Sequence, residues 1–132
     1  SSTINLIDEN TKYYKRKKKL MAFFSGSENF IIEKQAIDVQ NLSEFIKNKN
    51  IDNIDILKID TEGYEYNVLS GLIENDFKKI RFIYFEHHYD LMIKKEYKFN
   101  DINKLLLKNN FKQIFKIKMK FRKTFEYIYE KN

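Results

Sequence analysis

Residues 54–72 read IDILKIDTEGYEYNVLSGL, and this stretch decides the fold class. From Ile54 to Asp60, apolar residues fall on both faces of an extended chain, as in a parallel strand that is covered by helices on each side. A glycine at Gly63 follows, and apolar residues then recur with helical spacing as far as Leu72. The stretch therefore predicts a buried strand, a turn and a helix. Three charged side chains lie in the second half of the strand or just beyond it: Lys58, Asp60 and Glu62.

The remaining chain repeats this alternation of strands and helices. A short strand at 35–39 and a helix capped by Asn41 come before it, and a strand at 80–85 and a helix capped by Asn100 come after it. Residues 111–121 and 125–129 alternate apolar and polar side chains, which is typical of half-exposed strands. Together these patterns predict an α/β fold with a mostly parallel sheet and a terminal antiparallel hairpin.

Composition limits the classes of protein that need to be considered. A length of 132 residues suits one domain or part of one, and 42% apolar residues suffice for a core. No apolar run is long enough to cross a bilayer and no signal-peptide pattern opens the chain, so we expect no membrane span and a cytoplasmic protein. The absence of cysteine excludes disulfides and thiolate metal sites.

A net charge of +6 and the basic run at 14–19 raise the possibility of nucleic-acid binding. Lysine is abundant along the whole chain, however, and charge blocks are usually solvated surface with only nonspecific attraction for phosphate. We therefore favour a solvated surface over a nucleic-acid site. A basic polyanion-binding module stays as an alternative function.

The charged residues that follow the two central strands form a candidate site. Ligands of open parallel sheets bind outside the carboxyl ends of the strands, and a right-handed crossover makes the two strands neighbours. Lys58 could pair with a carboxylate, act as a base, or extend into water. Gly63 could serve a tight turn or the close approach of a ligand. The residues expected to converge at this edge are Asp60, Glu62, Glu86, His87 and His88.

The same residues carry a resemblance to a known family. Residues 54–71 resemble the signature I-D-x-L-K-I-D-x-E-G-x-E-x-x-V-L-x-G of FkbM-type methyltransferases. Residues 41–46, NLSEFI, resemble the stretch that precedes the signature in that family, and 85–88, FEHH, resemble the strand end that follows it. Residues 1–3 resemble a serine-rich segment further upstream.

This resemblance implies a Rossmann-like, doubly wound sheet and transfer of a methyl group from S-adenosylmethionine. The implied acceptor is a hydroxyl of a sugar or natural product. A cofactor site of this kind needs a glycine-rich turn, but the three glycines, Gly26, Gly63 and Gly71, form no such cluster. We therefore expect residues 1–132 to be the C-terminal portion of a single methyltransferase domain that is inactive alone. A noncatalytic remnant is a further alternative.

The resemblance and the charges together suggest a role for each candidate. His88 or His87 would take the hydroxyl proton, because histidine titrates near neutral pH, although either could be a structural partner of a carboxylate. Asp60 and Lys58 are further catalytic candidates, and Asp60 and Gly63 would contact the cofactor. Glu62 and Glu86 would bind the substrate. A divalent cation held by these carboxylates is an alternative that we do not favour, so no metal ligand is assigned.

Overall fold

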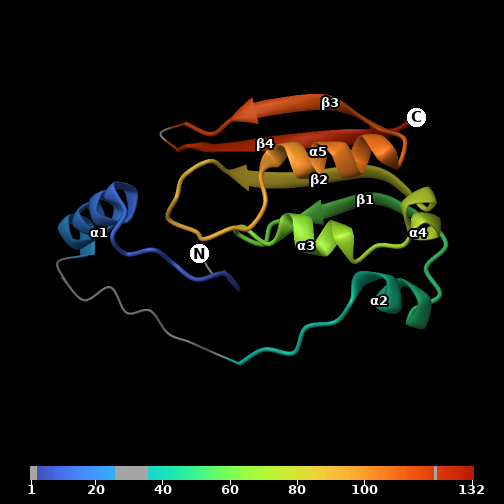
Figure 1. The fold of residues 1–132 in the computed structure, drawn as a ribbon, viewed down its shortest axis with the longest axis horizontal. Coiled ribbons are helices and arrows are strands. Elements are labelled where there is room, and N and C mark those ends of the chain that lie inside the picture. Colours follow the sequence, from blue (N-terminus) through green and yellow to red (C-terminus); the bar gives the residue numbers. More distant parts are fainter. Residues whose placement is uncertain (1–2, 26–35, 121) are drawn as a thin grey trace.

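The computed structural model describes residues 3–25, 36–120 and 122–132, which form a sheet with helices packed beside it (Figure 1). The quoted stretch forms a strand followed by a helix, as expected. The expected cover on both faces of the strand is wrong, because only Ile59 is buried and Ile56 is 62% exposed at the edge of the described sheet. In chain order the described elements are α1 (Lys12–Ser25), α2 (Leu42–Asn48), β1 (Ile54–Ile59), α3 (Glu65–Ser70), α4 (Glu74–Lys78), β2 (Ile80–His88), α5 (Phe99–Lys108), β3 (Phe111–Lys118) and β4 (Thr124–Lys131).

The four described strands form one sheet in the order β1-β2-β4-β3. β1 and β2 run parallel, whereas β4 lies between β2 and β3 and is antiparallel to both. The expected terminal antiparallel hairpin is therefore confirmed. Of the expected mostly parallel sheet, the described residues contain one parallel pair, so their sheet is mixed.

β2 is longer than its apolar pattern predicts. The pattern ends at Phe85, but the strand continues to His88. The extension exists because β4 keeps pairing with β2 beyond the end of β1, with Glu86 opposite Glu126 and His88 opposite Thr124. The last residues of β2 are therefore held by backbone hydrogen bonds of a strand and not by a loop.

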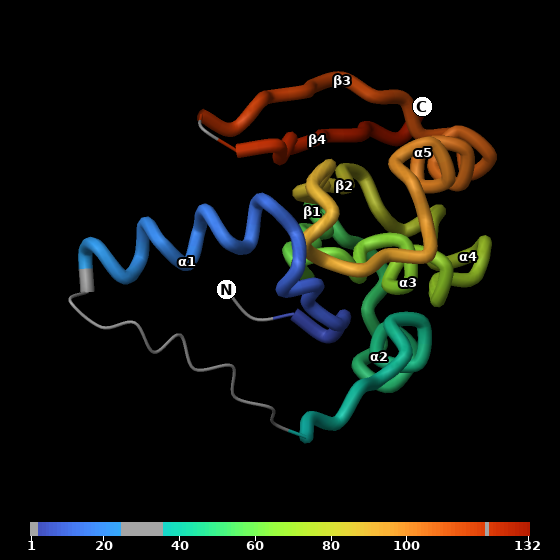
Figure 2. Tube along the Cα trace, turned by 60° about the vertical axis from the view of Figure 1, so that its left-hand side comes forward, coloured from blue at the N-terminus to red at the C-terminus, as the bar shows by residue number. Residues whose placement is uncertain are grey.

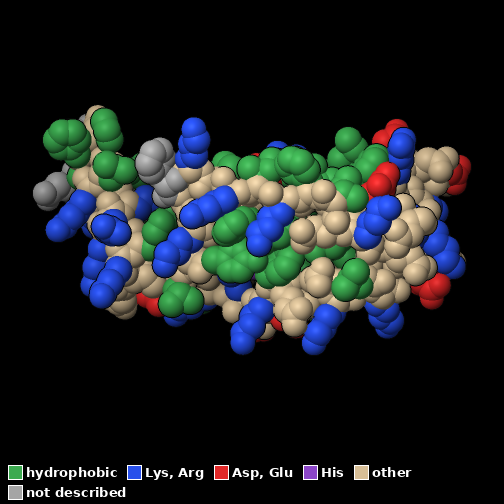
Figure 3. Space-filling view, turned by 90° about the horizontal axis from the view of Figure 1, so that it is seen from above, with side chains coloured by type: hydrophobic (Ala, Val, Ile, Leu, Met, Phe, Trp, Pro, Cys, Tyr) green, Lys and Arg blue, Asp and Glu red, His purple; other side chains and the backbone are tan. Residues whose placement is uncertain are grey.

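The sheet has two different faces. α3 and α5 lie against the helix-covered face (Figure 1), where Ile83, Phe85 and Tyr127 are fully buried. On the opposite face, which we call the open face, Ile56 is 62% and Phe115 50% exposed. Seen from the β3 edge, apolar side chains gather between lysine and arginine side chains (Figure 3). Alternate residues of β2 and β4 therefore meet either the packed core or the more accessible open face.

The helix boundaries test the capping residues. α2 begins after Asn41, whose Oδ1 accepts hydrogen bonds from Ser43 N at 2.9 Å and Glu44 N at 3.3 Å, so this cap is confirmed. The cap predicted at Asn100 is wrong, because α5 already begins at Phe99. There the side chain of Asp101 accepts a hydrogen bond from Lys98 N at 2.8 Å, which starts the helix earlier.

Two strand predictions also need correction. Residues 36–39 form no strand, and Ile37 and Val39 are 61% and 67% exposed, while Gln35 lies outside the described residues. β3 is exposed along almost its whole length, with only Phe111 buried, because it is an edge strand of the sheet and its predicted inner residues find no cover. No helix in the described part of the chain is long and apolar enough to cross a membrane.

Candidate functional site

The turn after β1 has an unusual backbone. Glu62 and Gly63 have φ angles of 50° and 103°, both in the left-handed region that side chains disfavour. The N-terminal segment holds this turn, since Thr3 Oγ1 donates to the Glu62 carbonyl at 2.8 Å and Asn5 Nδ2 donates to the Gly63 carbonyl. Side chains of the N-terminal segment therefore help to hold the backbone of this turn in place.

The side chain of Glu65 also holds this turn, by accepting hydrogen bonds from two of its residues. Its side chain is fully buried, and its Oε1 accepts hydrogen bonds from Gly63 N at 2.7 Å and from Thr61 Oγ1 at 3.2 Å. Its Oε2 accepts a hydrogen bond from the Tyr97 hydroxyl. Burial and the Glu65 carboxylate raise the pKa of Tyr97, so this hydroxyl keeps its proton as a donor. Glu65 thus joins the turn after β1 to the segment before α5.

Gly63 is surrounded by the chain itself. A Cβ placed on Gly63 would lie 2.6 Å from Ile93 Cγ2 and 3.1 Å from Asn5 Nδ2. Together with the positive φ, this contact explains the glycine by the tight turn. Its predicted contact with a cofactor stays a prediction.

Adjacent residues at the end of β2 face opposite ways. Glu86 and His88 lie on the open face, and His87 lies on the helix-covered face between them, as the strand alternation requires. His88 is 6% exposed and His87 3% exposed. The expected cluster of Glu86, His87 and His88 therefore separates into two environments.

Three carboxylates surround His88. Its Nε2 lies 3.0 Å from Glu62 Oε2 and 3.2 Å from Glu86 Oε1, and its Nδ1 lies 3.4 Å from Asp90 Oδ2. Thr124 Oγ1 is 3.1 Å from the same Nδ1. We call Asp60, Glu62, Glu86, His88 and Asp90 the carboxyl-end rim, since they follow or end β1 and β2.

The charged groups of the rim shift the pKa values of one another. Burial alone would lower the pKa of His88, but the hydrogen bond to Asp90 and the charges of Glu62 and Glu86 raise it above its ordinary value. Burial would likewise raise the pKa of Asp90, yet hydrogen bonds from His88 and from Met92 N lower it. Burial raises the pKa of Glu86, and the charge of Asp60 adds to this shift. The shifts of this pair favour a protonated His88 beside an ionised Asp90.

His87 has the opposite protonation. Burial, followed by the positive charges of Lys95 and His88, lowers the pKa of His87 to about 4. Its ring lies 4.8 Å from the ring of Tyr89 and 5.9 Å from those of Tyr97 and Phe99. At neutral pH it is therefore a neutral ring in an aromatic environment.

Lys58 remains in water. Its Nζ lies 3.8 Å from Asp60 Oδ2, and the two side chains are 59% and 46% exposed. The same ammonium group lies 5.5 Å from the centroid of the Tyr84 ring. These contacts match a surface ion pair, and Lys58 as a base stays a prediction.

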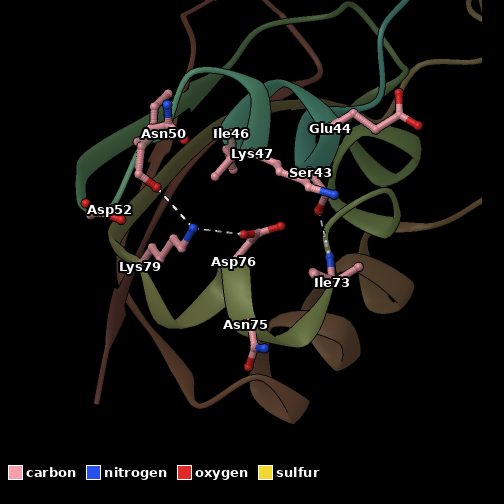
Figure 4. Close-up of a pocket in the computed structure, with 11 residues that line it drawn as sticks. Ser43, Glu44, Ile46, Lys47, Asn50, Asp52, Ile73, Asn75, Asp76 and Lys79 are labelled. Atoms are coloured by element: carbon pink, nitrogen blue, oxygen red, sulfur yellow. Dashed lines mark hydrogen bonds and ion pairs between the residues drawn. The ribbon is translucent and has the colours of Figure 1, made fainter.

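One hollow lies away from the rim. It measures about 660 Å³ and separates α2 from α4 near the amino end of β1 (Figure 4). Lys79 Nζ bridges it by donating to the Ile51 carbonyl at 3.1 Å and by pairing with Asp76 at 3.5 Å. We regard this hollow as part of the packing, because its buried charge is already paired. A hollow of about 310 Å³ lies beside the rim and is lined by Thr61, Tyr64 and Asn67 among others.

The site includes residues that the patterns did not predict. Asp90, Glu65 and Tyr97 were not candidates, although Glu65 stands inside the quoted stretch two residues after Gly63. A carboxylate at that spacing can reach back to the turn, which was the available signal. Within residues 3–25, 36–120 and 122–132, no group of three or more acidic or histidine side chains has an arrangement that could hold a metal ion.

A parallel strand pair with a polar rim at its carboxyl end is the arrangement in which open α/β sheets bind ligands. The family model described as Methyltransferase FkbM domain matches residues 3–113. The chain therefore belongs to the FkbM methyltransferase family. No curated protein and no solved structure matches it significantly.

Proposed function

We propose that this chain takes part in methyl transfer from S-adenosylmethionine to a hydroxyl of a sugar or natural product. The observation that supports the proposal is the position of the carboxyl-end rim, which lies within the residues matched by the family. Asp60, Glu62 and Glu86 present acceptor oxygens on one face. Such acceptors suit a substrate that is rich in hydroxyl groups.

The rim also suits the cofactor. When bound, S-adenosylmethionine supplies an electrophilic methyl group on a positively charged sulfonium sulfur. Asp60 and Glu62 are the residues we propose to face it, because carboxylates attract a positive charge and accept hydrogen bonds from ribose hydroxyls. Gly63 would help by keeping the turn short.

Glu86 is the residue we propose to take the hydroxyl proton. Its Oε1 lies 3.2 Å from His88 Nε2 and its side chain is 15% exposed, so the carboxylate keeps acceptor capacity to which an acceptor hydroxyl could donate. Burial raises the pKa of Glu86, which makes its carboxylate a better proton acceptor than an exposed one. The raised pKa of His88 favours a different role for this histidine, that of a counter-charge that orients Glu62 and Glu86. His87, neutral but on the other face, is the alternative base.

The test begins with binding. S-adenosylmethionine is titrated calorimetrically into residues 1–132 and into the same chain extended upstream by about one hundred residues, a typical domain-sized addition. Binding by the longer chain alone would support both the proposed function and the expectation that the first half of the domain is missing. Binding by neither would contradict the proposed function.

Transfer of a labelled methyl group to a panel of sugars and polyhydroxylated natural products then tests Glu86 in the protein that binds. Glu86→Gln should lower kcat by about 10²-fold or more, because a general base is lost, while binding of S-adenosylmethionine persists. Glu74→Gln is the matched control, since Glu74 lies on α4 and its side chain is 79% exposed. Equal kcat values for the two variants would contradict the role of Glu86.

The cytoplasmic location stays a prediction from composition.

A further inference from the structure

α1 carries a positive charge as large as that of the whole chain. It contains six basic residues and no acidic one, and the chain has a formal net charge of +6. All other residues together are therefore formally neutral. Five of the basic residues are consecutive, at 15–19, and at 100° per residue they surround the helix completely. We call this segment the basic collar.

The far end of α1 is apolar and accessible. Leu20 is 59%, Phe23 82% and Phe24 79% exposed, and we call these three residues the apolar tip. The near end of the helix is anchored, since Tyr14 is buried against Met92 and Ile93. From this anchor α1 extends away from the sheet (Figure 2), beyond the carboxyl ends of β1 and β2 (Figure 1).

We propose that α1 docks on an anionic lipid surface, with the apolar tip in the membrane interface and the basic collar among the headgroups. Moving aromatic and leucine side chains from water to the boundary of headgroups and acyl chains lowers the free energy. Electrostatic attraction between lysines and anionic lipids strengthens the binding further. Leu20, Phe23 and Phe24 are spaced i, i+3 and i+4, so they lie on one face of the helix. Interfacial helices bury such a face about 5–10 Å deep. The basic collar thus lies next to the apolar tip along α1, as anionic headgroups lie next to the apolar acyl chains in a membrane.

Other occupants fit less well. A nucleic acid would bind the basic collar, but Leu20 would gain nothing from phosphate groups. A second copy of the chain could cover the apolar tip, but it would bring a second basic collar close to the first, and like charges repel. An anionic membrane satisfies both features at once. The proposal does not depend on the proposed methyl transfer.

Vesicle sedimentation tests the proposal with the whole chain. The protein is mixed with vesicles of phosphatidylcholine alone and with vesicles containing about one third phosphatidylserine, which carry a negative surface potential. We expect binding to the anionic vesicles and a clear decrease of this binding as salt is added. Equal binding to both vesicle types, or binding to neither, would overturn the proposal.

Two pairs of variants separate the contributions. Phe23→Ser with Phe24→Ser should weaken binding by at least about tenfold, because two buried aromatic rings are lost. Leu107→Ser with Ile73→Ser is the control, since these apolar residues are 54% and 59% exposed elsewhere. Lys17→Gln, Lys18→Gln and Lys19→Gln together should weaken binding by about 100-fold, or about fivefold for each lysine. Lys104→Gln, Lys108→Gln and Lys112→Gln remove the same charge from α5 and β3.

Circular dichroism would show that each variant keeps its helices. Controls that weaken binding as much as the α1 variants would contradict a specific role for α1. An oligonucleotide mixed with the same proteins gives the remaining comparison. Binding to the oligonucleotide that depends on the basic collar, together with no binding to anionic vesicles, would assign α1 to nucleic acid and overturn the proposal.

Discussion

His87 and His88 are neighbours in the chain, but they lie on opposite faces of the sheet and have pKa values shifted in opposite directions. His87 lies among aromatic rings on the helix-covered face, and its pKa falls to about 4. His88 lies among three carboxylates on the open face, and its pKa rises. Both are almost fully buried, so burial alone does not set the protonation state. Burial is the largest cause of the low pKa of His87, whereas the hydrogen bond to Asp90 and the nearby carboxylate charges overcome burial at His88.

The largest expected effect comes from Glu65, on which the geometry beside both histidines depends. Glu65→Ala removes the acceptor of three hydrogen bonds and leaves Gly63 N and the Tyr97 hydroxyl without a partner. We expect a loss of about 3 kcal/mol in the free energy of unfolding, measured with urea. Glu65→Gln keeps one carbonyl oxygen and should lose less. If Glu65→Ala were as stable as the wild type, the hydrogen bonds of Glu65 would not be needed to stabilise the turn.

His88→Leu should be the next largest change. It leaves Glu62, Glu86 and Asp90 close together without their counter-charge, and we expect a loss of about 2–3 kcal/mol at neutral pH. Because the folded-state pKa of His88 is raised, its stabilisation is complete below about pH 6.5 and is lost as pH rises through the folded-state pKa. Unfolding experiments from pH 6 upward should show this decline in the wild type and not in His88→Leu. A decline of equal size in both would assign it to another group.

His87→Phe tests the other face, where the wild type should show the opposite dependence of stability on pH. The folded-state pKa of His87 is lowered, so its neutral form stabilises the fold above about pH 6.5, and this stability is lost as pH falls towards 4. The expected loss is about 2–3 kcal/mol over this range. His87→Phe should remove the loss, because phenylalanine suits the rings of Tyr89 and Phe99 and takes up no proton. An unchanged acid slope would contradict this account.

The smallest effect is expected at Lys58. Its ion pair with Asp60 is long and solvent-exposed, so Lys58→Gln should change the free energy of unfolding by less than about 0.5 kcal/mol. The measurement is the same urea titration at neutral pH. A loss as large as that of His88→Leu would mean that the charges of the open face act as one network.

The quoted stretch predicted the part of the site that depends on local pattern. Ile54 to Asp60 indicates a parallel strand, and a crossover rule then places Asp60 beside the end of the next strand. The expected cover on both faces of this strand was wrong, because no described helix packs over Ile56. The register confirms this, with Ile59 opposite Phe85 one residue before Asp60 and Glu86. The spacing of apolar residues, the glycine of the turn and the crossover rule were sufficient to predict this part of the site, because all three depend on residues that are close in the sequence.

The parts that were missed depend on distant partners. Glu65 sits in the first turn of α3, where acids are common, and one of its two carboxylate oxygens is bound by the hydroxyl of Tyr97, 32 residues further on. Glu86 and His88 belong to a strand because β4 pairs with them, which an apolar pattern ending at Phe85 does not indicate. The divergence of the two histidines likewise follows from side chains on several elements.

The charge of α1 has a further consequence for the behaviour of the protein in solution. Because the chain without this helix is formally neutral, mutual repulsion between molecules comes almost entirely from one projecting segment. A protein near zero net charge associates more readily, so deleting α1 should lower solubility most strongly near neutral pH. The helix would then act as a colloidal stabiliser that keeps the exposed apolar residues of the open face apart.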